Sequence, residues 1–241
     1  MISVCIATHN GEKYIKEQLD SILCQLSSDD EIVISDDGST DYTLKIIEGY
    51  NDPRIKIYTM VHKLKGMKSH YYVTMNFENA LKHAKGDYIF LSDQDDVWMP
   101  NKVEVCVNLL KDYDIVVHNL AFMRMNGDSL GTCRYVGSFE RENIFMLGAV
   151  HFGCAMAFRA NWLRYVLPFP RKLVLHDFWI SYIIEKLGNP KFLMEPLIKY
   201  RVRGDSVSNG TSNNIIYKIR YRLYIAYCII SRITKIRMTK Q

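Results

Sequence analysis

The chain has 241 residues, of which 48% are hydrophobic and 24% are charged. These values are near the globular average and exclude a disordered, collagen-like or coiled-coil protein. The net charge of +5 is unevenly distributed, because no Asp or Glu follows Asp205 while seven Lys and Arg residues do. Residues 1–205 hold all of the acidic residues of the chain. This body of the chain therefore lacks the spread basic face expected of a nucleic-acid-binding fold. The basic tail stays a candidate for contact with an anionic surface.

The cysteines and the apolar runs indicate in which cellular compartment the protein is expected. None of the six cysteines forms a C-x-x-C pair, so the sequence favours neither a disulfide framework nor a zinc knuckle. The N-terminus lacks the basic and apolar regions of a signal peptide. The longest apolar run of the tail, residues 223–230, is far shorter than the ~20 residues that span a bilayer. We therefore expect a cytoplasmic protein, with peripheral contact at the inner face of the cell membrane as a further expectation.

Short apolar runs alternate with segments of helical periodicity through the first half of the chain. In chain order, the predicted elements are strand 2–7, helix 14–22, strand 31–35, helix 42–50, strand 54–59, a helix through 77–84, strand 88–92, a helix opened by Pro100 and strand 114–118. Apolar strands that alternate with helices are typical of an α/β fold with a mostly parallel sheet covered on both faces. Ligands bind outside the carboxyl ends of such strands. The polar clusters 8–12, 36–41 and 93–96 all follow strand ends, so we expect a site at that edge.

The second half is less regular, with a predicted strand at 153–158, a helix at 176–187 and short strands at 192–194 and 197–202. Near the end, large apolar residues recur at helical spacing: Ile216, Ile219, Leu223, Tyr227, Ile230 and Ile233. This pattern fits either an interfacial helix on anionic lipid or a helix packed on the body. We expect a catalytic domain over residues 1–208 and a basic, amphipathic extension over 209–241.

The cluster of Asp93, Asp95 and Asp96 is the sharpest chemical feature. Three carboxylates so close together repel one another unless a cation lies among them, and oxygen ligands suit Mg²⁺ or Mn²⁺. The alternative is an acidic helix start before Pro100. The segment 36–41 has a similar choice, because it suits a tight turn with a helix cap and could also bring a carboxylate to a base or ribose.

Several familiar catalytic patterns are absent from the sequence. There is no G-x-G-x-x-G, P-loop or G-x-S-x-G pattern and no histidine pair with zinc spacing. The pair His176-Asp177 begins a mostly apolar predicted helix, which places Asp177 either as a first-turn acid or at the edge of a cleft. An acidic cluster combined with an isolated carboxylate suits a reaction in which a diphosphate leaves and a hydroxyl must be deprotonated.

Taken in order, these motifs resemble the family 2 glycosyltransferases, which are inverting enzymes of the GT-A fold. The matching segments are 3–15, 21–25, 36–41, 85–96, 153–154, 176–177 and 200–201. The resemblance covers about residues 2–208. The run 92–98 together with 176–179 looks most like the bacterial rhamnosyltransferase-like branch.

The resemblance implies a role for residues from along the whole chain. Those residues are Thr8, Asn10 and Glu12 lining the nucleotide pocket, Asp37 on the pyrimidine, Asp93 on the donor, Asp95 near the ribose or sugar, Asp95 and Asp96 in the metal motif, Gly153 and Cys154 near the donor sugar, Asp177 as general base, and Arg203 on the diphosphate. Three positions depart from the family pattern: relatives often have Tyr at His9, Glu at His176 and His at Arg203.

The activity so implied is inverting transfer of a sugar from dTDP-rhamnose or a UDP-sugar to a hydroxyl of a glycan or lipid-linked saccharide, in bacterial surface polysaccharide synthesis. The implied cofactor is Mg²⁺ or Mn²⁺. One alternative is a nucleotidyltransferase, although that chemistry usually uses a basic glycine-rich N-terminal loop. The other is a catalytically inactive nucleotide-sugar binding module that partners a membrane enzyme.

Overall fold

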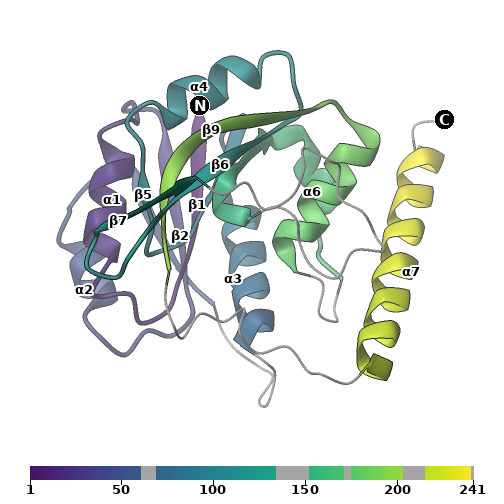
Figure 1. Cartoon of the computed structure of the whole chain (residues 1–241), viewed down its shortest axis with the longest axis horizontal. Coiled ribbons are helices and arrows are strands. Elements are labelled where there is room, and N and C mark those ends of the chain that lie inside the picture. Colours follow the sequence, from purple (N-terminus) through teal and green to yellow (C-terminus); the bar gives the residue numbers. More distant parts are fainter. Residues whose placement is uncertain (61–68, 134–151, 171–174, 203–214, 240–241) are drawn as a thin grey trace.

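The computed structural model describes residues 1–60, 69–133, 152–170, 175–202 and 215–239 (Figure 1). The strands are β1 (Ile2–Thr8), β2 (Glu31–Asp36), β3 (Ile55–Thr59), β4 (Tyr88–Ser92), β5 (Val97–Trp98), β6 (Ile115–Met123), β7 (Ser129–Cys133), β8 (Met156–Arg159) and β9 (Pro190–Arg201). The α-helices are α1 (Ile15–Leu23), α2 (Thr43–Glu48), α3 (Ser69–His83), α4 (Lys102–Leu109), α5 (Leu163–Val166), α6 (His176–Leu187) and α7 (Ile215–Thr239). Two short 3₁₀ helices, η1 (Gly153–Ala155) and η2 (Ala160–Trp162), flank β8.

All nine strands of the described chain belong to one sheet. Its order is β3-β2-β1-β4-β8-β6-β9-β5, and β7 pairs with the free part of β6. Strands β1 to β4 are mutually parallel, and β6 and β9 run in the same direction. Strands β5, β7 and β8 run against their neighbours. The prediction of a mostly parallel α/β sheet is confirmed.

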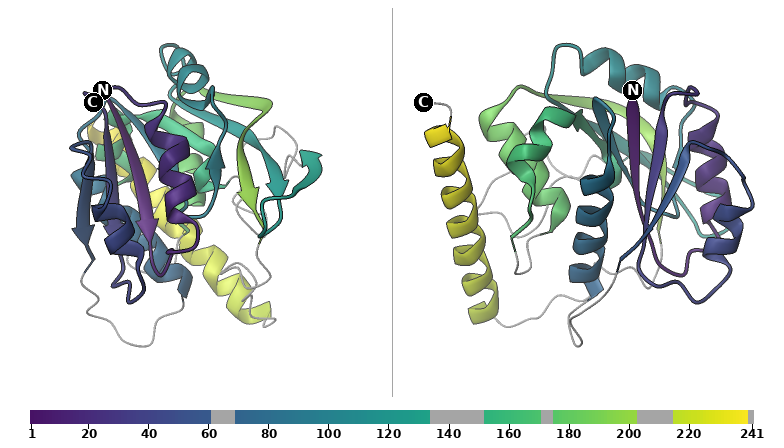
Figure 2. Two further views of the ribbon diagram at one scale, coloured as in Figure 1. Left: turned by 90° about the vertical axis from the view of Figure 1, so that its left-hand side faces the viewer. Right: turned by 180° about the vertical axis from the view of Figure 1, so that it is seen from behind.

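Helices cover both faces of the sheet, as the apolar strands predicted (Figures 1 and 2). On one face α1, α2 and α4 pack through residues such as Leu19, Ile47 and Cys106. On the other face α3 and α6 pack through residues such as Phe77 and Trp179. Strands β1, β2 and β4 therefore have apolar side chains on both faces, and the polar clusters follow their ends.

The second half differs in detail from the sequence prediction. Strand β9 is a single long strand, where two short ones were predicted. Its register against β6 shifts between His118↔Leu193 and Asn119↔Pro196. Pro196 has no N–H to donate to the ladder, and prolines within sheets are found at such irregularities. The predicted strand from Gly153 begins with η1 instead, and β8 starts at Met156.

The terminal helix α7 packs against α6 at one side of the molecule (Figure 1). Among the described helices, none combines the length and the hydropathy needed to cross a bilayer. The division into 1–208 and 209–241 stays a prediction. Arg203 lies outside the described residues.

Candidate active site

The carboxyl ends of β2, β1 and β4 lie next to one another at one edge of the sheet. Thr8 pairs with Asp36 in the β1–β2 register, and Ile6 pairs with Ser92 in the β1–β4 register. Because parallel neighbours end at the same edge, the three polar clusters that follow these strands come together there.

Asp36 is a fully buried carboxylate that joins the first two clusters. Its Oδ2 accepts hydrogen bonds from Thr8 Oγ1 at 2.9 Å and from Ser39 Oγ at 2.6 Å. Its Oδ1 accepts a hydrogen bond from the Ser39 N–H at 2.8 Å. Several donors to one carboxylate compensate the cost of burying its charge. Asp36 therefore fixes the conformation of this part of the edge, and Thr8 takes part through its hydrogen bond to Asp36.

Asn10 and Glu12 connect the turn after β1 to the turn after β2. Asn10 has a φ of 49°, which asparagine tolerates better than most residues, and its N–H donates to Ser39 Oγ at 2.9 Å. Its Oδ1 accepts a hydrogen bond from the Thr40 N–H at 2.8 Å. Glu12 Oε2 accepts one from the Tyr42 N–H at 3.0 Å. These side chains hold together the two turns that would form a nucleotide pocket.

Asp37 directly follows β2 and is half-buried. Its N–H donates to the carbonyl oxygen of Thr8 at 2.9 Å. Its own carbonyl oxygen accepts a hydrogen bond from Nδ1 of His9 at 2.7 Å. Both backbone polar groups of Asp37 are thus held, which fixes the turn that presents its side chain. His9, one of the three departures from the family pattern, takes part in this turn.

The acidic cluster after β4 contains a group that could hold a cation. Ligand atoms of Asp93, Asp96 and Cys154 all lie within 4.8 Å of one another. Asp96 is 1% exposed, and its Oδ1 accepts a hydrogen bond from the Arg201 N–H at 3.0 Å. Its Oδ2 is buried and makes no hydrogen bond of normal geometry within the described chain. Asp95, the other expected metal ligand, is buried but is not a member of this group of three.

The electrostatics of Asp96 also suit a cation. Burial raises its pKa well above the usual 3.8, and the charges of Asp93 and Asp95 raise it further. The Arg201 N–H and the Cys154 thiol lower this pKa, but by less. The pKa of Cys154 is raised well above its ordinary value, chiefly by burial and to a smaller extent by the charges of Asp96 and Asp93. The thiol therefore stays protonated. The carboxylates of Asp93 and Asp96 therefore fit a hard divalent cation such as Mg²⁺ or Mn²⁺.

Arg201, at the end of β9, holds the acidic loop in place. Its Nε donates to the carbonyl oxygen of Asp95 at 2.8 Å, in addition to the backbone bond to Asp96. Its Nη2 donates to Glu17 Oε2 at 2.6 Å and its Nη1 to the Met125 carbonyl at 3.0 Å. With a side chain only 2% exposed, Arg201 connects four segments of the chain.

Lys102 lies beside this cluster, and sequence reasoning did not single it out. It is fully buried at the start of α4, and its Nζ donates to the carbonyl oxygen of Cys154 at 2.8 Å. The ammonium also lies 4.2 Å from the ring centroid of Trp98. Burial lowers the pKa of Lys102 to about 8, although the thiols and carboxylates around it act in the opposite direction. In the sequence, the sign that pointed to Lys102 was a basic residue six positions after Asp96.

The turn η1 connects the acidic cluster to Asp177. Cys154 lies within the group described above, and the preceding Gly153 lies against the start of α6. A Cβ atom at Gly153 would lie 2.7 Å from Nε2 of His176 and 3.7 Å from Cβ of Asp177. His176 is buried and stacks on Phe77 with ring centroids 4.1 Å apart. Glycine is required at 153 because a side chain there would collide with the imidazole.

Asp177 occupies the first turn of α6 and is half-buried. Its Oδ1 accepts a hydrogen bond from the Phe178 N–H at 2.7 Å. The structure thus brings together Thr8, Asn10, Glu12 and Asp37 on one part of the edge, and Asp93, Asp96, Gly153, Cys154 and Asp177 on the other.

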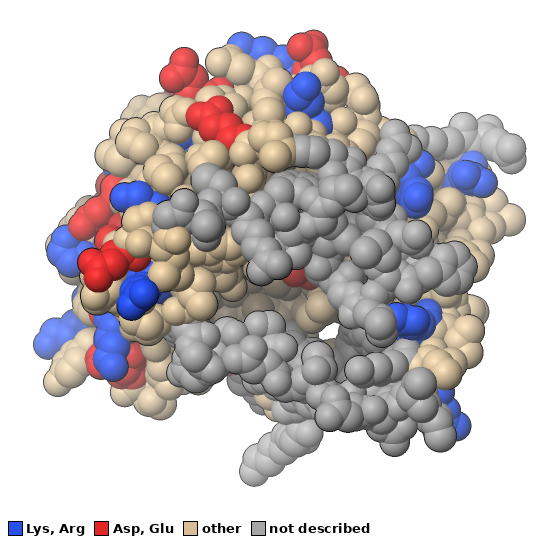
Figure 3. Space-filling view, in the orientation of Figure 1, with Lys and Arg blue, Asp and Glu red and all other residues tan. Residues whose placement is uncertain are grey.

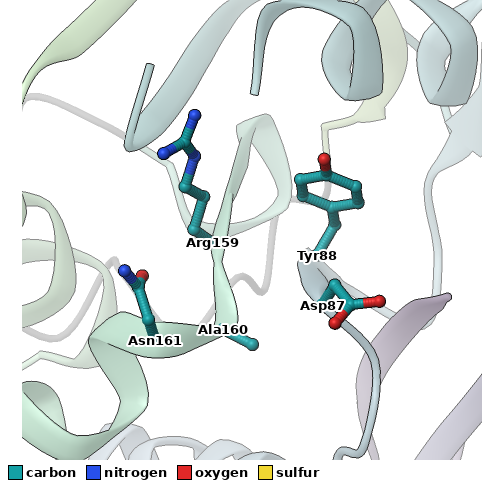
Figure 4. Close-up of a pocket in the computed structure, with 5 residues that line it drawn as sticks. All are labelled: Asp87, Tyr88, Arg159, Ala160 and Asn161. Carbon is teal, nitrogen blue, oxygen red and sulfur yellow. The ribbon is translucent and has the colours of Figure 1, made fainter. Parts of the chain in front are cut away.

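A hollow of about 260 Å³ lies elsewhere on the molecule (Figure 4). It is lined by Asp87, Tyr88, Arg159, Ala160 and Asn161. Tyr88 begins β4, whereas the acidic cluster follows the end of that strand. The hollow is therefore separate from the candidate site and contains none of its residues.

Comparison with known proteins gives the same assignment as the motifs. The family model described as "Glycosyl transferase family 2" matches residues 3–165. The dTDP-rhamnosyl transferase RfbG of Shigella flexneri is 28% identical over 239 residues, covering 90% of this chain and 77% of that protein. An uncharacterized glycosyltransferase of Nostoc sp. is 30% identical over 217 residues, covering 84% of this chain and 65% of that one.

Solved structures share the fold. The TarS 1–349 fragment of S. aureus, in complex with UDP-GlcNAc, superposes with a TM-score of 0.64 at 22% identity, covering 88% of this chain and 61% of that one. The mannosyltransferase PcManGT of Pyrobaculum calidifontis, in complex with GDP-Man and Mn²⁺, has a TM-score of 0.60 at 19% identity, covering 86% and 58%. The chain spans 65–68% of the length of the first curated relatives. The expected GT-A fold is confirmed, and with the family model matching well over half of its length the chain belongs to glycosyltransferase family 2.

Proposed function

We propose that the protein transfers a sugar, with inversion, from a nucleoside-diphosphate sugar to a hydroxyl of a glycan or lipid-linked saccharide in bacterial surface polysaccharide synthesis. The proposed donor is dTDP-rhamnose or a UDP-sugar. The name of RfbG supports the first choice. The second is supported by the E. coli relative WfgD, a UDP-Glc:α-D-GlcNAc-diphosphoundecaprenol β-1,3-glucosyltransferase that is 30% identical over 140 residues, covering 58% of this chain and 50% of that protein.

The observation that carries the proposal is the position of Asp177 next to the acidic cluster across η1. In the proposed reaction the acceptor oxygen attacks the anomeric carbon in line with the departing diphosphate. The bond between the anomeric carbon and the diphosphate oxygen breaks, and its electron pair leaves with the diphosphate. Asp177 takes the proton from the acceptor hydroxyl, which makes it the general base.

The other residues of the edge bind and orient the donor. Asp37 accepts hydrogen bonds from the pyrimidine in this proposal. Asp93 and Asp96 would hold a divalent cation, which offsets the charge that grows on the leaving diphosphate. Arg201 and Lys102 hold the segments that carry these groups, so the geometry is in place before the donor arrives.

The experiment starts with donor identification. Purified protein is screened by thermal shift against dTDP-rhamnose, UDP-glucose, UDP-GlcNAc and GDP-mannose with Mn²⁺ present, because the stabilisation by a ligand grows with the ratio of its concentration to its Kd. Release of nucleoside diphosphate from the stabilising donor is then measured with and without EDTA. Release that continues undiminished in excess EDTA would contradict the metal role. Stabilisation without any release, with or without acceptor, would instead favour an inactive nucleotide-sugar binding module.

The base is tested by Asp177→Asn, with the exposed Asp29→Asn as a matched control. Removing a positioned general base should lower turnover by roughly 10²–10⁴-fold. The donor-induced thermal shift should be nearly unchanged, because Asp177 acts on the acceptor. Near-wild-type transfer by Asp177→Asn would show that the base assignment is wrong.

A further inference from the structure

Helix α7 has two apolar faces, of which one is used inside the molecule. Ile225, Ile229 and Ile236 are 7%, 1% and 4% exposed and belong to the core shared with α6. Arg232 fixes the same face, because its guanidinium donates to the carbonyl oxygens of Tyr165, Leu167 and Pro168 at 2.6–3.0 Å. The helix is thus packed on the body, as one of the two interpretations of the sequence predicted.

The second face points away from the body and is also apolar. Its members are 52–70% exposed and recur at helical spacing: Ile219, Leu223, Tyr227, Ile230 and Met238. We call these five residues the outer stripe. They include four of the six residues from which the sequence predicted an amphipathic helix, so most of that pattern lies on the exposed face, whereas Ile233 packs against the core. In Figure 2, α7 lies outside α6 on the side away from the sheet.

The charge around the outer stripe is entirely positive in the sequence. No acidic residue follows Asp205, and seven Lys and Arg residues do. Of these, Arg220, Lys235 and Arg237 are exposed on α7. Figure 3 shows blue and tan surface on the side that α7 occupies, whereas red and blue surface are mixed on the opposite side and at the top.

We infer that the outer stripe lies on the surface of an anionic lipid bilayer, with α7 parallel to the membrane plane. An exposed apolar stripe edged by Lys and Arg is the pattern by which helices bind at the bilayer interface, and anionic headgroups attract the bases. A second copy of the chain is a poorer occupant, because two such helices would oppose like charges. This inference rests on α7 alone and holds whichever donor the sheet edge binds.

The test is co-sedimentation of the full chain with lipid vesicles. One vesicle contains phosphatidylcholine alone, and the other is an equal mixture of phosphatidylcholine and phosphatidylglycerol. The chain should bind the mixed vesicles at least about 10-fold more tightly, with the difference reduced at high salt. Equal binding to both vesicles, or binding to neither, would overturn the inference.

Paired substitutions locate the contact. Leu223→Ser with Tyr227→Ser removes apolar surface and should weaken binding at least about 10-fold. Arg220→Gln with Arg237→Gln removes charge and should also weaken it about 10-fold. The matched control, Tyr42→Ser with Met194→Ser, alters residues that are 65% and 59% exposed elsewhere and should bind as the wild type does. All these positions are exposed, and unchanged thermal unfolding checks that each variant is folded.

Two results would refute the assignment to the outer stripe. Binding that the Leu223/Tyr227 variant retains in full would place the membrane contact elsewhere. A dimer seen by sedimentation velocity, and abolished in that same variant, would make the outer stripe an interface between copies of the chain.

Discussion

Two buried carboxylates stand at the same edge of the sheet in opposite situations. Asp36 accepts hydrogen bonds from Thr8 and Ser39 on both of its oxygens. Asp96 accepts one from the backbone of Arg201, and its Oδ2 has no partner of normal geometry in the described chain. A saturated carboxylate stabilises a loop, whereas an unsaturated one is costly until a charged ligand arrives. In our proposal Asp96 therefore lies at a cation site, whereas Asp36 stabilises the loop around it.

Among the tests of this comparison, the largest effect is expected from Asp96→Asn. Mn²⁺ binding in the presence of UDP should weaken at least about 100-fold, because losing even an outer partner of a metal site costs roughly 10–100-fold. In EDTA the free energy of unfolding should not fall, since the amide removes a charge that burial disfavours. Calorimetric titration and urea unfolding measure the two quantities. Asp36→Asn is the control for binding, and equal losses of Mn²⁺ affinity in both variants would abolish the distinction.

Lys102→Met comes next. Without the ammonium, the Cys154 carbonyl loses its donor, and η1 can shift relative to both Asp96 and Asp177. We expect a loss of roughly 10–100-fold in the rate of nucleoside diphosphate release, the range found for supporting residues of a metal site. The exposed Lys111→Met should behave as the wild type does. A fully active Lys102→Met would show that this hydrogen bond has no role in turnover.

Asp36→Asn should act on stability instead. Removing the charge weakens its hydrogen bonds with Thr8 and Ser39 and leaves an amide N–H₂ facing donors. The free energy of unfolding should fall by about 1–3 kcal/mol, measured by urea denaturation. If the variant is as stable as the wild type, Asp36 is not the structural partner that the comparison makes it.

The smallest expected effect is the pH dependence of the free energy of unfolding. Burial, together with the charge of Lys102, lowers the pKa of His118 well below 6.5, and burial lowers the pKa of His176. Both imidazoles are neutral when folded and take up a proton on unfolding below pH 6.5. The free energy of unfolding is therefore largest above that pH and falls as the pH drops toward the folded pKa values, by at most about 1.4 kcal/mol per pH unit for each group. Urea denaturation at a series of pH values should show a shallower slope for His118→Gln; a slope equal to the wild type would contradict this.

The strand ends were predictable because apolar runs and polar turns alternate clearly in the first half. Ile2–Thr8, Glu31–Asp36 and Tyr88–Ser92 agree with the predicted strands to within a residue. Their parallel pairing followed from the same pattern, and it brought the three polar clusters to one edge. Strand β9 was harder, because Pro196 interrupts the alternation and the register shift that absorbs it is a tertiary feature.

The buried partners of the site could not be predicted in the same way. A lysine in the first turn of a helix reads as a solvated charge, and only the fold shows that Lys102 is fully buried against Cys154 and Trp98. Asp36 and Asp37 are adjacent in the sequence and chemically identical. Only the contacts of Thr8 and Ser39 show that Asp36 is the structural one.

Gln94 has a consequence for how the two parts of the edge communicate. Its side-chain amide accepts a hydrogen bond from the His9 N–H at 2.9 Å and donates one to the His9 carbonyl at 3.0 Å. The acidic loop and the N-terminal turn are therefore joined as if by one more rung of the β1–β4 ladder. If occupancy of one part changes the free energy of ordering the other through this link, thermodynamic linkage makes that effect reciprocal. A cation that tightens nucleotide binding by some factor must itself be held more tightly, by the same factor, once the nucleotide is bound.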